Sequence, residues 1–320
     1  MLKDQVLLPK TGFYKANLHS HTVVSDGRFT PEEAKAAYQK EGYSIVAFTD
    51  HRKYVWHKEL DSEDFLALAA VEVDLTEQGK DWPVSKTYHL NLFDTAPSPR
   101  REELDLLPHF AYDDKEALNQ YIARMNELGF LVCYNHPYWS LQNYDDYKDL
   151  QGLFAMEIYN HGCEVEGLYG FNPQSYDEML RAGQRLCALA TDDNHNAYPL
   201  NGPEGDSFGG FVQIAAQRLD YPSVIQALRE NRFYWSMGPQ LKGVEIQDGL
   251  LKIHSSPVEK IFVKLENRNY YRKQVLPGES LEYAEFPLTG KEGWLRVEVK
   301  DSRGLLAGTS AFFIDQLAAD

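Results

Sequence analysis

The feature that most constrains this chain is an apolar run that leads into two histidines and an acidic turn. Residues 13–18 are mostly apolar or aromatic and predict a short strand. His19 and His21 follow two positions apart, so their side chains project from the same side of the strand's end. The Ser-Asp-Gly turn at 25–27 brings the carboxylate of Asp26 back toward them. Imidazole and carboxylate are common ligands of zinc, iron and related ions, so this stretch predicts half of a metal site. The alternative is a pair of exposed polar side chains.

The same arrangement recurs along the chain, where short apolar runs carry or precede further residues of metal-ligand type. These residues are His51 after 44–48, Glu72 within 66–74, His89 in the run around residue 89, His136 after 130–134, and Asp193 and His195 after 186–190. In a parallel barrel covered by helices, strand ends converge on one face, which is where such enzymes place their chemistry. Each histidine alone is well explained as a core or surface imidazole. The set as a whole predicts a metal centre.

Helix signals between these runs predict β/α units. Thr30 is a good N-cap, Pro31 suits the first helical position, and Glu33 completes a capping box. Gly42 supplies a stop, so residues 13–48 predict strand, helix and strand. Further helices are predicted over 114–128, 172–183 and 222–230.

After Pro239 the pattern changes to short strand-like runs separated by Asp-Gly, Pro-Gly, Thr-Gly and Arg-Gly turns. These runs predict an all-β sandwich of about 80 residues, and no metal motif occurs among them. We therefore predict a barrel domain over residues 1–239 and a small β-sandwich domain over residues 240–320. The second domain is expected to shield the barrel or to mediate formation of a homo-oligomer; the alternative is substrate binding.

Composition limits the partners. The net charge of −16, from 32 basic and 48 acidic residues, leaves no surplus of Lys and Arg with which to hold a nucleic acid backbone, so a long nucleic acid is disfavoured. No apolar run reaches the ~18 residues of a membrane span, and the N-terminus lacks the features of a signal peptide. We expect no membrane partner and a cytoplasmic location. Three cysteines without a Cys-x-x-Cys pair predict neither a disulfide framework nor a zinc ribbon.

The motif order is similar to that of the PHP family, named for polymerase and histidinol phosphatase. His-x-His with Ser-Asp-Gly, Thr-Asp-His, Glu, His, Asn-His-Pro and Asp-x-His occur in that order across roughly residues 12–238. Segments 154–160, 190–195, 208–212 and 232–239 resemble the branch that contains carbaryl-hydrolase-like proteins. The resemblance implies the α/β class, a distorted seven-stranded β/α barrel that holds metal ions, and a small appended β domain. Many members cleave phosphate esters.

The resemblance also implies how the ligands divide among metal ions. His19, His21, Glu72 and Asp193 would hold one ion, Asp26, His51 and His136 a second, and Glu72, His89 and His195 a third, with Glu72 bridging. Mixed imidazole and carboxylate ligands suit zinc, iron or manganese, and an anionic bridge lets two cations lie within ~4 Å of each other. The predicted cofactors are therefore two or three divalent metal ions.

Such a pair of ions lowers the pKa of a bridging water toward ~7. The predicted function is therefore hydrolysis of a small phosphate mono- or diester by a metal-bridging hydroxide. One alternative is a metal-dependent amidohydrolase or esterase that acts on a carbamate or carboxylic ester, and another is a non-catalytic, metal-stabilised binding protein. An arginine in the pocket would favour the phosphoesterase, and an apolar pocket would favour the amidohydrolase.

Three residues are predicted to be catalytic. Asp193 is a metal ligand required for turnover, His161 is the candidate acid for the leaving group, and the fork-shaped guanidinium of Arg52 would contact phosphate. Asp50 and Asp192, each beside a ligand, are expected to orient an imidazole or the backbone. Two further residues have alternative roles, contact with substrate or a buried structural position: Glu157 and Asn160.

Overall fold

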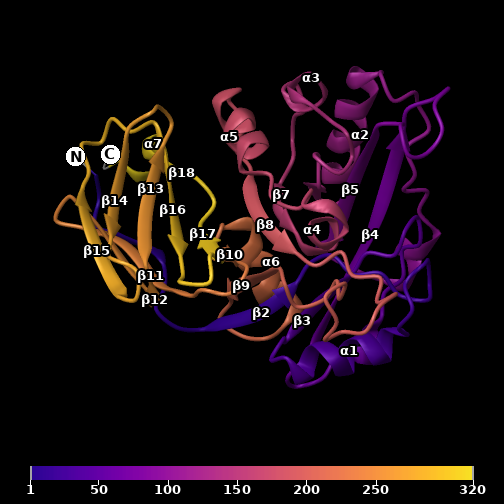
Figure 1. Ribbon diagram of the computed structural model, residues 1–320. Helices are drawn as coiled ribbons and strands as arrows, with labels where there is room; N and C mark the ends of the chain where they lie inside the picture. Colours follow the sequence, from indigo (N-terminus) through magenta and orange to yellow (C-terminus); the bar gives the residue numbers. More distant parts are fainter. Residues whose placement is uncertain (1, 319–320) are drawn as a thin grey trace.

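The chain folds into two adjoining groups of strands (Figure 1). The structure, a computed structural model, describes residues 2–318. The larger group carries helices on its outside and lies on the right of Figure 1. Its strands are β2 (Phe13–Asn17), β3 (Ile45–Phe48), β4 (Leu66–Thr76), β5 (Thr87–Asp94), β6 (Phe130–Tyr134), β7 (Ala155–Asn160), β8 (Cys187–Thr191), β9 (Phe211–Ala215) and β10 (Phe233–Ser236).

Strands β2 to β8 are neighbours in chain order within one large sheet. β2, β3 and β4 pair in parallel, as do β6, β7 and β8, whereas β5 runs antiparallel to both of its neighbours. β9 is antiparallel to β2, and β8 contacts β9 and β10 without pairing with either in the part of the chain described. The predicted α/β class is confirmed. A closed seven-stranded barrel is not confirmed, because the hydrogen-bonded ladder ends at β8.

The helices agree with the local sequence signals. At the start of α1, Thr30 accepts a hydrogen bond from the backbone of Glu33, whose carboxylate accepts from the Thr30 backbone at 2.8 Å. The four predicted helices are confirmed as α1 (Pro31–Lys40), α2 (Lys115–Glu127), α5 (Pro173–Arg181) and α6 (Tyr221–Arg229). Shorter helices that were not predicted are α3 (Tyr144–Tyr147), α4 (His161–Gly167) and the 3-10 turns η1 (Lys58–Leu60) and η2 (Pro99–Glu103). Within residues 2–318, no helix is long and apolar enough to cross a membrane.

The smaller group of strands surrounds a second apolar core that includes Ile253, Val263 and Val297. One of its layers has the strand order β1-β11-β12-β15, and the other continues the large sheet because β17 pairs with β10. Its elements are β1 (Gln5–Leu8), β11 (Leu241–Gln247), β12 (Leu250–Val258), β13 (Lys260–Leu265), β14 (Tyr270–Gln274), β15 (Leu281–Pro287), β16 (Trp294–Lys300), β17 (Leu306–Gly308), β18 (Phe312–Phe313) and α7 (Ile314–Leu317).

A buried ion-pair network joins the two groups. Arg296 on β16 is 0% exposed, and its Nε donates to Asp177 Oδ1 on α5 at 2.9 Å, while its other side pairs with Glu298. The N-terminal strand β1 also crosses over, because it pairs with β11 in the smaller group. The domain boundary between residues 239 and 240 stays a prediction.

Candidate metal centre

His19 and His21 lie just after β2 and are completely buried. Each is 0% exposed, and their Nε2 atoms are 3.1 Å apart, so both rings project to one side as the two-residue spacing predicts. The turn that follows closes tightly over them. A Cβ on Gly27 would lie 2.4 Å from the carbonyl oxygen of His21, which only glycine avoids. This turn places the carboxylate of Asp26 next to the two imidazoles, with Oδ1 at 3.7 Å from His21 Nδ1.

Glu72, on β4, is the centre of the cluster. Five imidazoles have a nitrogen within 3.5 Å of its carboxylate oxygens: His51 (2.9 Å), His89 (3.0 Å), His19 (3.4 Å), His21 (3.4 Å) and His136 (3.5 Å). Asn135 also donates to Glu72 Oε1 at 2.8 Å. Burial would raise the pKa of Glu72, but the imidazoles of His89 and His19 hold it well below its usual value. Glu72 is therefore a buried anion surrounded by nitrogen ligands.

Asp193, which follows β8, provides a second carboxylate. Its Oδ1 lies 3.0 Å from His21 Nε2 and 3.1 Å from His19 Nε2, and Asn160 donates to its Oδ2 at 3.0 Å. Burial would raise the pKa of Asp193, but the imidazole of His19 and a hydrogen bond with His21 hold it well below its usual value. The backbone φ of Asp193 is +54°, a left-handed conformation that favours glycine and that recurs at functional sites.

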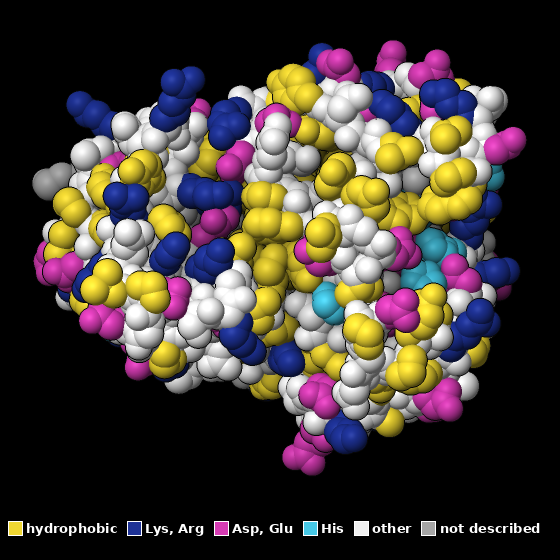
Figure 2. Space-filling model, in the orientation of Figure 1, with side chains coloured by type: hydrophobic (Ala, Val, Ile, Leu, Met, Phe, Trp, Pro, Cys, Tyr) yellow, Lys and Arg dark blue, Asp and Glu magenta, His cyan; other side chains and the backbone are white. Residues whose placement is uncertain are grey.

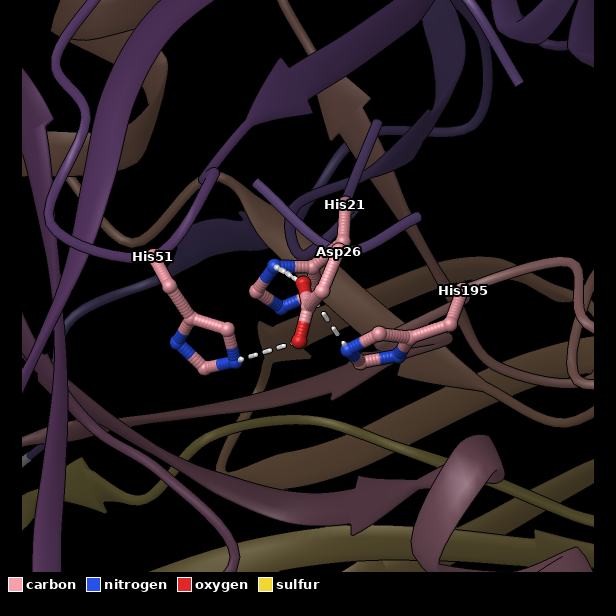
Figure 3. A group of neighbouring side chains, drawn as sticks. All are labelled: His21, Asp26, His51 and His195. Carbon is pink, nitrogen blue, oxygen red and sulfur yellow. Dashed lines mark ion pairs between the residues drawn. The ribbon is translucent and has the colours of Figure 1, made fainter. Parts of the chain in front are cut away.

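Asp26 lies between three imidazoles at the open side of the cluster. Figure 3 shows its carboxylate directed toward His21, His51 and His195. Its oxygens are 3.5 Å from His195 Nε2 and 3.7 Å from His51 Nε2. Burial would raise the pKa of Asp26, but the hydrogen bond and charge of His195 lower it strongly. Burial would lower the pKa of His195, but the hydrogen bond with Asp26 raises it to about 9.

Three groups of ligand atoms are compact enough to hold an ion, with the atoms of each group within 4.8 Å of one another. The groups are His19, His21, Glu72 and Asp193; His21, Asp26, His51 and His195; and His51, Glu72 and His89. The first is the set that the family resemblance implies. The other two differ from the implied sets, because His195 lies beside Asp26 rather than with Glu72 and His89. The reason is a backbone contact, since Arg28 N donates to His195 O at 2.8 Å and holds the two loops together.

His136 lies at the edge of the cluster, outside these three groups. Its Nε2 is 3.5 Å from Glu72 Oε1 and 3.7 Å from Asp193 Oδ2, while its Nδ1 is 3.2 Å from the hydroxyl of Ser140. Its backbone φ is +24°, another position where the chain is strained beside the cluster. All nine predicted ligands therefore lie around one centre, but their assignment to individual ions stays a prediction.

The donor set fits divalent metal ions. Two buried atoms in the cluster, His21 Nδ1 and Glu72 Oε2, have no partner in hydrogen-bonding geometry within the described residues, although His51 Nδ1 lies 2.9 Å from Glu72 Oε2. Buried polar atoms are normally satisfied, because leaving one without a partner costs about 1–3 kcal/mol. A cation is the partner that suits both a neutral imidazole nitrogen and a carboxylate oxygen. Imidazoles mixed with carboxylates are typical of zinc, iron and manganese sites.

Asp50 and Asp192 hold backbone segments, in agreement with the role expected of them. Asp50 Oδ1 accepts hydrogen bonds from the backbone of Thr22 at 2.7 Å and of Ser25 at 3.1 Å, within the segment that carries Asp26. Asp192 accepts from three consecutive backbone groups, those of Phe208, Gly209 and Gly210, at 2.7–2.9 Å. Both carboxylates therefore fix loops that border the metal centre.

Arg52 and His161 interact with residues outside the ligand cluster. The guanidinium of Arg52 forms two hydrogen bonds with Asp74, the one from Nε being 2.6 Å long. His161, the first residue of α4, accepts or donates at Nδ1 with the Tyr159 hydroxyl at 2.9 Å, and its ring lies so close to Gly209 that a Cβ there would clash. Neither residue is among those that line the cavity described next. Their predicted roles, phosphate contact and leaving-group acid, remain untested predictions.

The cluster forms the floor of a cavity of about 270 Å³. Figure 2 shows the histidines on this face of the molecule, bordered by acidic and hydrophobic side chains. Some residues of the walls were not predicted from the sequence: Trp139, Gly162, Cys163, Val165 and Glu166, together with Ala197, Tyr198, Glu204 and Asp206 from the loop after β8. Those residues lie in α4 and in irregular segments, which carry no periodic signal. No Lys or Arg of the described chain is among the lining residues.

Comparisons with known proteins show a short stretch of sequence similarity to a bacterial enzyme. No protein-family model matches the chain. The chain is 33% identical over 94 residues to the DNA polymerase/3'-5' exonuclease PolX of Bacillus subtilis, a match that covers 24% of this chain and 16% of that protein. The chain thus spans only a small part of the length of this relative.

Two solved structures are similar in part. One is a two-domain protein from Bacteroides vulgatus that contains a predicted PHP-like metal-dependent phosphoesterase, with 14% identity, a TM-score of 0.49 and coverage of 97% of this chain and 99% of that chain. The other is a proposed metal-dependent phosphoesterase from Bifidobacterium adolescentis, with 18% identity, a TM-score of 0.38 and coverage of 58% and 90%.

Proposed function

We propose that this protein is a metal-dependent hydrolase of small phosphate mono- or diesters. Its resemblance to the PHP family is confirmed by its PolX relative and its ligand cluster. The observation that carries the proposal is the position of Glu72, which is buried with five imidazoles within 3.5 Å of its carboxylate. A carboxylate has about four acceptor sites, and Asn135 already occupies one of those of Glu72. Five imidazoles exceed the acceptor sites that remain on this one anion, so they are better explained by several cations bound between the nitrogens and the carboxylate.

The three groups of ligand atoms would hold two or three divalent ions, of zinc, iron or manganese. Bound ions would lower the pKa of a coordinated water and neutralise charge on a phosphate oxygen. The residues of the chain contribute geometry. Asp50 and Asp192 fix the loops around the cavity, and the buried imidazoles of His19 and His21 hold their nitrogens toward Glu72 and Asp193. We propose that all imidazoles of the cluster are committed to ions, so none is free to act as a general base.

The cavity supports a small substrate. Its volume of about 270 Å³ is below the ≈ 300–1,000 Å³ of pockets that enclose drug-sized ligands. The walls carry carboxylates from Glu166, Glu204 and Asp206, which would repel the backbone of a long nucleic acid. A phosphate in this cavity would have its charge neutralised by the bound ions alone.

A second candidate function follows from the same lining. Because no described Lys or Arg lines the cavity, there is no guanidinium to recognise a phosphate in a fork. A carbamate or carboxylic ester carries no such charge, and Trp139, Val165 and Tyr198 offer apolar surface for it. We therefore keep a metal-dependent amidohydrolase or esterase as the alternative.

We also propose a structural interpretation of the two groups of strands. Strands β2 to β8 would represent a distorted seven-stranded barrel in which the segments after β2 and β8 meet only through a parallel bridge between Ser20 and Asn194. Residues 240–320 would represent a β-sandwich domain. The parallel pairs on both sides of the β4–β5 hairpin and the separate core around Ile253 support this interpretation. Limited proteolysis that releases a stable fragment ending near residue 239 would test the boundary. Stable cleavage only at other positions would contradict it.

The deciding experiment is a comparison of substrates with the metal-loaded protein. Nitrophenyl phosphate, bis(nitrophenyl) phosphate, nitrophenyl acetate and a nitrophenyl carbamate share one chromophore, so their kcat/KM values are directly comparable. We expect turnover of a phosphate ester that disappears on chelation and returns with added metal. Exclusive turnover of the acetate or carbamate would favour the alternative. Metal binding without turnover of any ester would count against a hydrolase.

A further inference from the structure

A bulge in β7 directs two polar side chains into the interior. The pairing of β7 with β8 shifts register between Glu157 and Tyr159. In a regular strand, residues 157 and 160 would face opposite sides, because their separation is odd. The extra residue in the bulge lets both side chains lie on the same side, where Asn160 Nδ2 donates to Glu157 Oε2 at 2.9 Å. Both side chains are 0% exposed, and neither lines the cavity, so Glu157 lies behind the metal centre and does not touch a substrate.

The carboxylate of Glu157 is fully occupied by four donors. Its Oε1 lies 2.7 Å from His19 Nδ1 and accepts from the Thr191 hydroxyl at 2.7 Å. Its Oε2 accepts from the Asn160 amide and from the backbone of His136 at 3.2 Å. Buried carboxylates hydrogen-bonded to the outer nitrogen of a histidine fix the tautomer and orientation of that ring. Here the bond to Nδ1 leaves Nε2 of His19 as the ligand atom, 3.1 Å from Asp193.

The same carboxylate reaches two other predicted ligands. It holds the backbone of His136, and it positions Asn160, whose amide also donates to Asp193 Oδ2 at 3.0 Å. Glu157 is thereby connected to three of the predicted ligands. It is hydrogen-bonded directly to His19 and to the backbone of His136, and it reaches Asp193 through the amide of Asn160. In the described chain, it has no hydrogen bond to Asp26, His51 or His195, which form the open side of the cluster.

We propose that Glu157 is a positioning residue for the metal ion held by His19, His21, Glu72 and Asp193, and that it acts on this ion selectively. The proposal rests on the proposed metal-dependent function. Loss of an outer partner of a ligating histidine typically costs 10–100-fold in metal affinity. The variant Glu157→Gln keeps the shape of the side chain but removes its charge, so we expect one class of site to weaken by about 10–100-fold. The ion near Asp26 should bind as in the wild type.

The test is a titration of metal-free protein with Mn²⁺, followed by electron paramagnetic resonance in the presence of a competing chelator. This gives the number of sites and the Kd of each without measuring activity. A matched control is Glu292→Gln, because Glu292 is also buried, at 4% exposed, but accepts its hydrogen bonds from Thr289 in the smaller group of strands. The control should bind every ion as the wild type does.

A second variant covers the case in which Glu157→Gln does not fold. Thr191→Val keeps the charge of Glu157 but removes one hydrogen bond to Oε1, and should weaken the same class of site about fivefold, the equivalent of one ordinary hydrogen bond.

The outcomes separate the two hypotheses. Wild-type protein that binds less than one Mn²⁺ per chain would refute the proposed metal-dependent function. Wild-type binding with unchanged affinities in Glu157→Gln, or an equal loss at all sites, would refute selective positioning by Glu157 and leave the proposed function standing.

Discussion

Replacing Asp193 by asparagine is the sharpest test of the metal centre. Asp193 adopts a left-handed backbone conformation with φ of +54°, which asparagine tolerates about as well as aspartate. The substitution should therefore leave the fold intact. It replaces one carboxylate oxygen, in a group 3.0 Å from His21 Nε2 and 3.1 Å from His19 Nε2, by an amide nitrogen that binds no metal.

The expected magnitude follows from the position of the carboxylate inside the cluster. Loss of an outer partner of a ligand costs 10–100-fold in metal affinity, so loss of a charged ligand should cost more than about 100-fold, or about 2.7 kcal/mol. At a free metal concentration of about 100 times the wild-type Kd, the wild-type site is nearly full. The corresponding site of the variant should be half occupied or less, and hydrolysis should fall in proportion.

The assay combines equilibrium dialysis with elemental analysis, ester hydrolysis and thermal unfolding. Asp248→Asn is the matched control, because Asp248 has the same φ of +54° in a surface turn far from the metal ligands along the chain. The control should keep wild-type metal content and rate. If Asp193→Asn also keeps both, Asp193 is not a metal ligand and the interpretation of the cluster is wrong.

Four further predictions use other parts of the structure. Chelation should lower Tm, because an ion at 100 times its Kd stabilises the folded state by about 2.7 kcal/mol; an unchanged Tm would contradict a resident ion. Arg296→Met should lower the free energy of unfolding in urea by about 3–5 kcal/mol, because Asp177 and Glu298 lose a buried partner; a loss below about 1 kcal/mol would show that the pairs contribute little. Glu204→Gln should lower KM for nitrophenyl phosphate up to about fivefold at low salt, and the change should vanish at high salt. His161→Ala should slow hydrolysis of an alkyl phosphate more than that of nitrophenyl phosphate, because His161 is the predicted acid for the leaving group; equal effects on both esters would rule out that role.

Local patterns predicted much of the ligand set. His19 and His21 face one side because strand geometry repeats every two residues, and the Thr30–Glu33 capping box forms because its hydrogen bonds join residues three apart. Strand ends gather residues distant in the sequence, so His51 could be predicted to approach Glu72, which it does at 2.9 Å. The facing of the two histidines and the capping box depend only on short segments. The approach of His51 to Glu72 depends on the rule that strand ends converge on one face.

The division of ligands and the catalytic assignments depended on contacts that no local pattern contains. His195 lies beside Asp26 because their loops share a backbone hydrogen bond across more than 160 residues of sequence. Arg52 is directed to Asp74 by an ion pair between neighbouring segments. A bulge in β7, which its apolar run does not reveal, lets Asn160 contact Glu157. Periodicity determined which side chains share a face, whereas long-range pairing and register decided which of them meet. The sequence therefore determined the kind of centre, and only the tertiary structure decided its internal arrangement, because hydrogen bonds between distant segments set distances that sequence spacing does not encode.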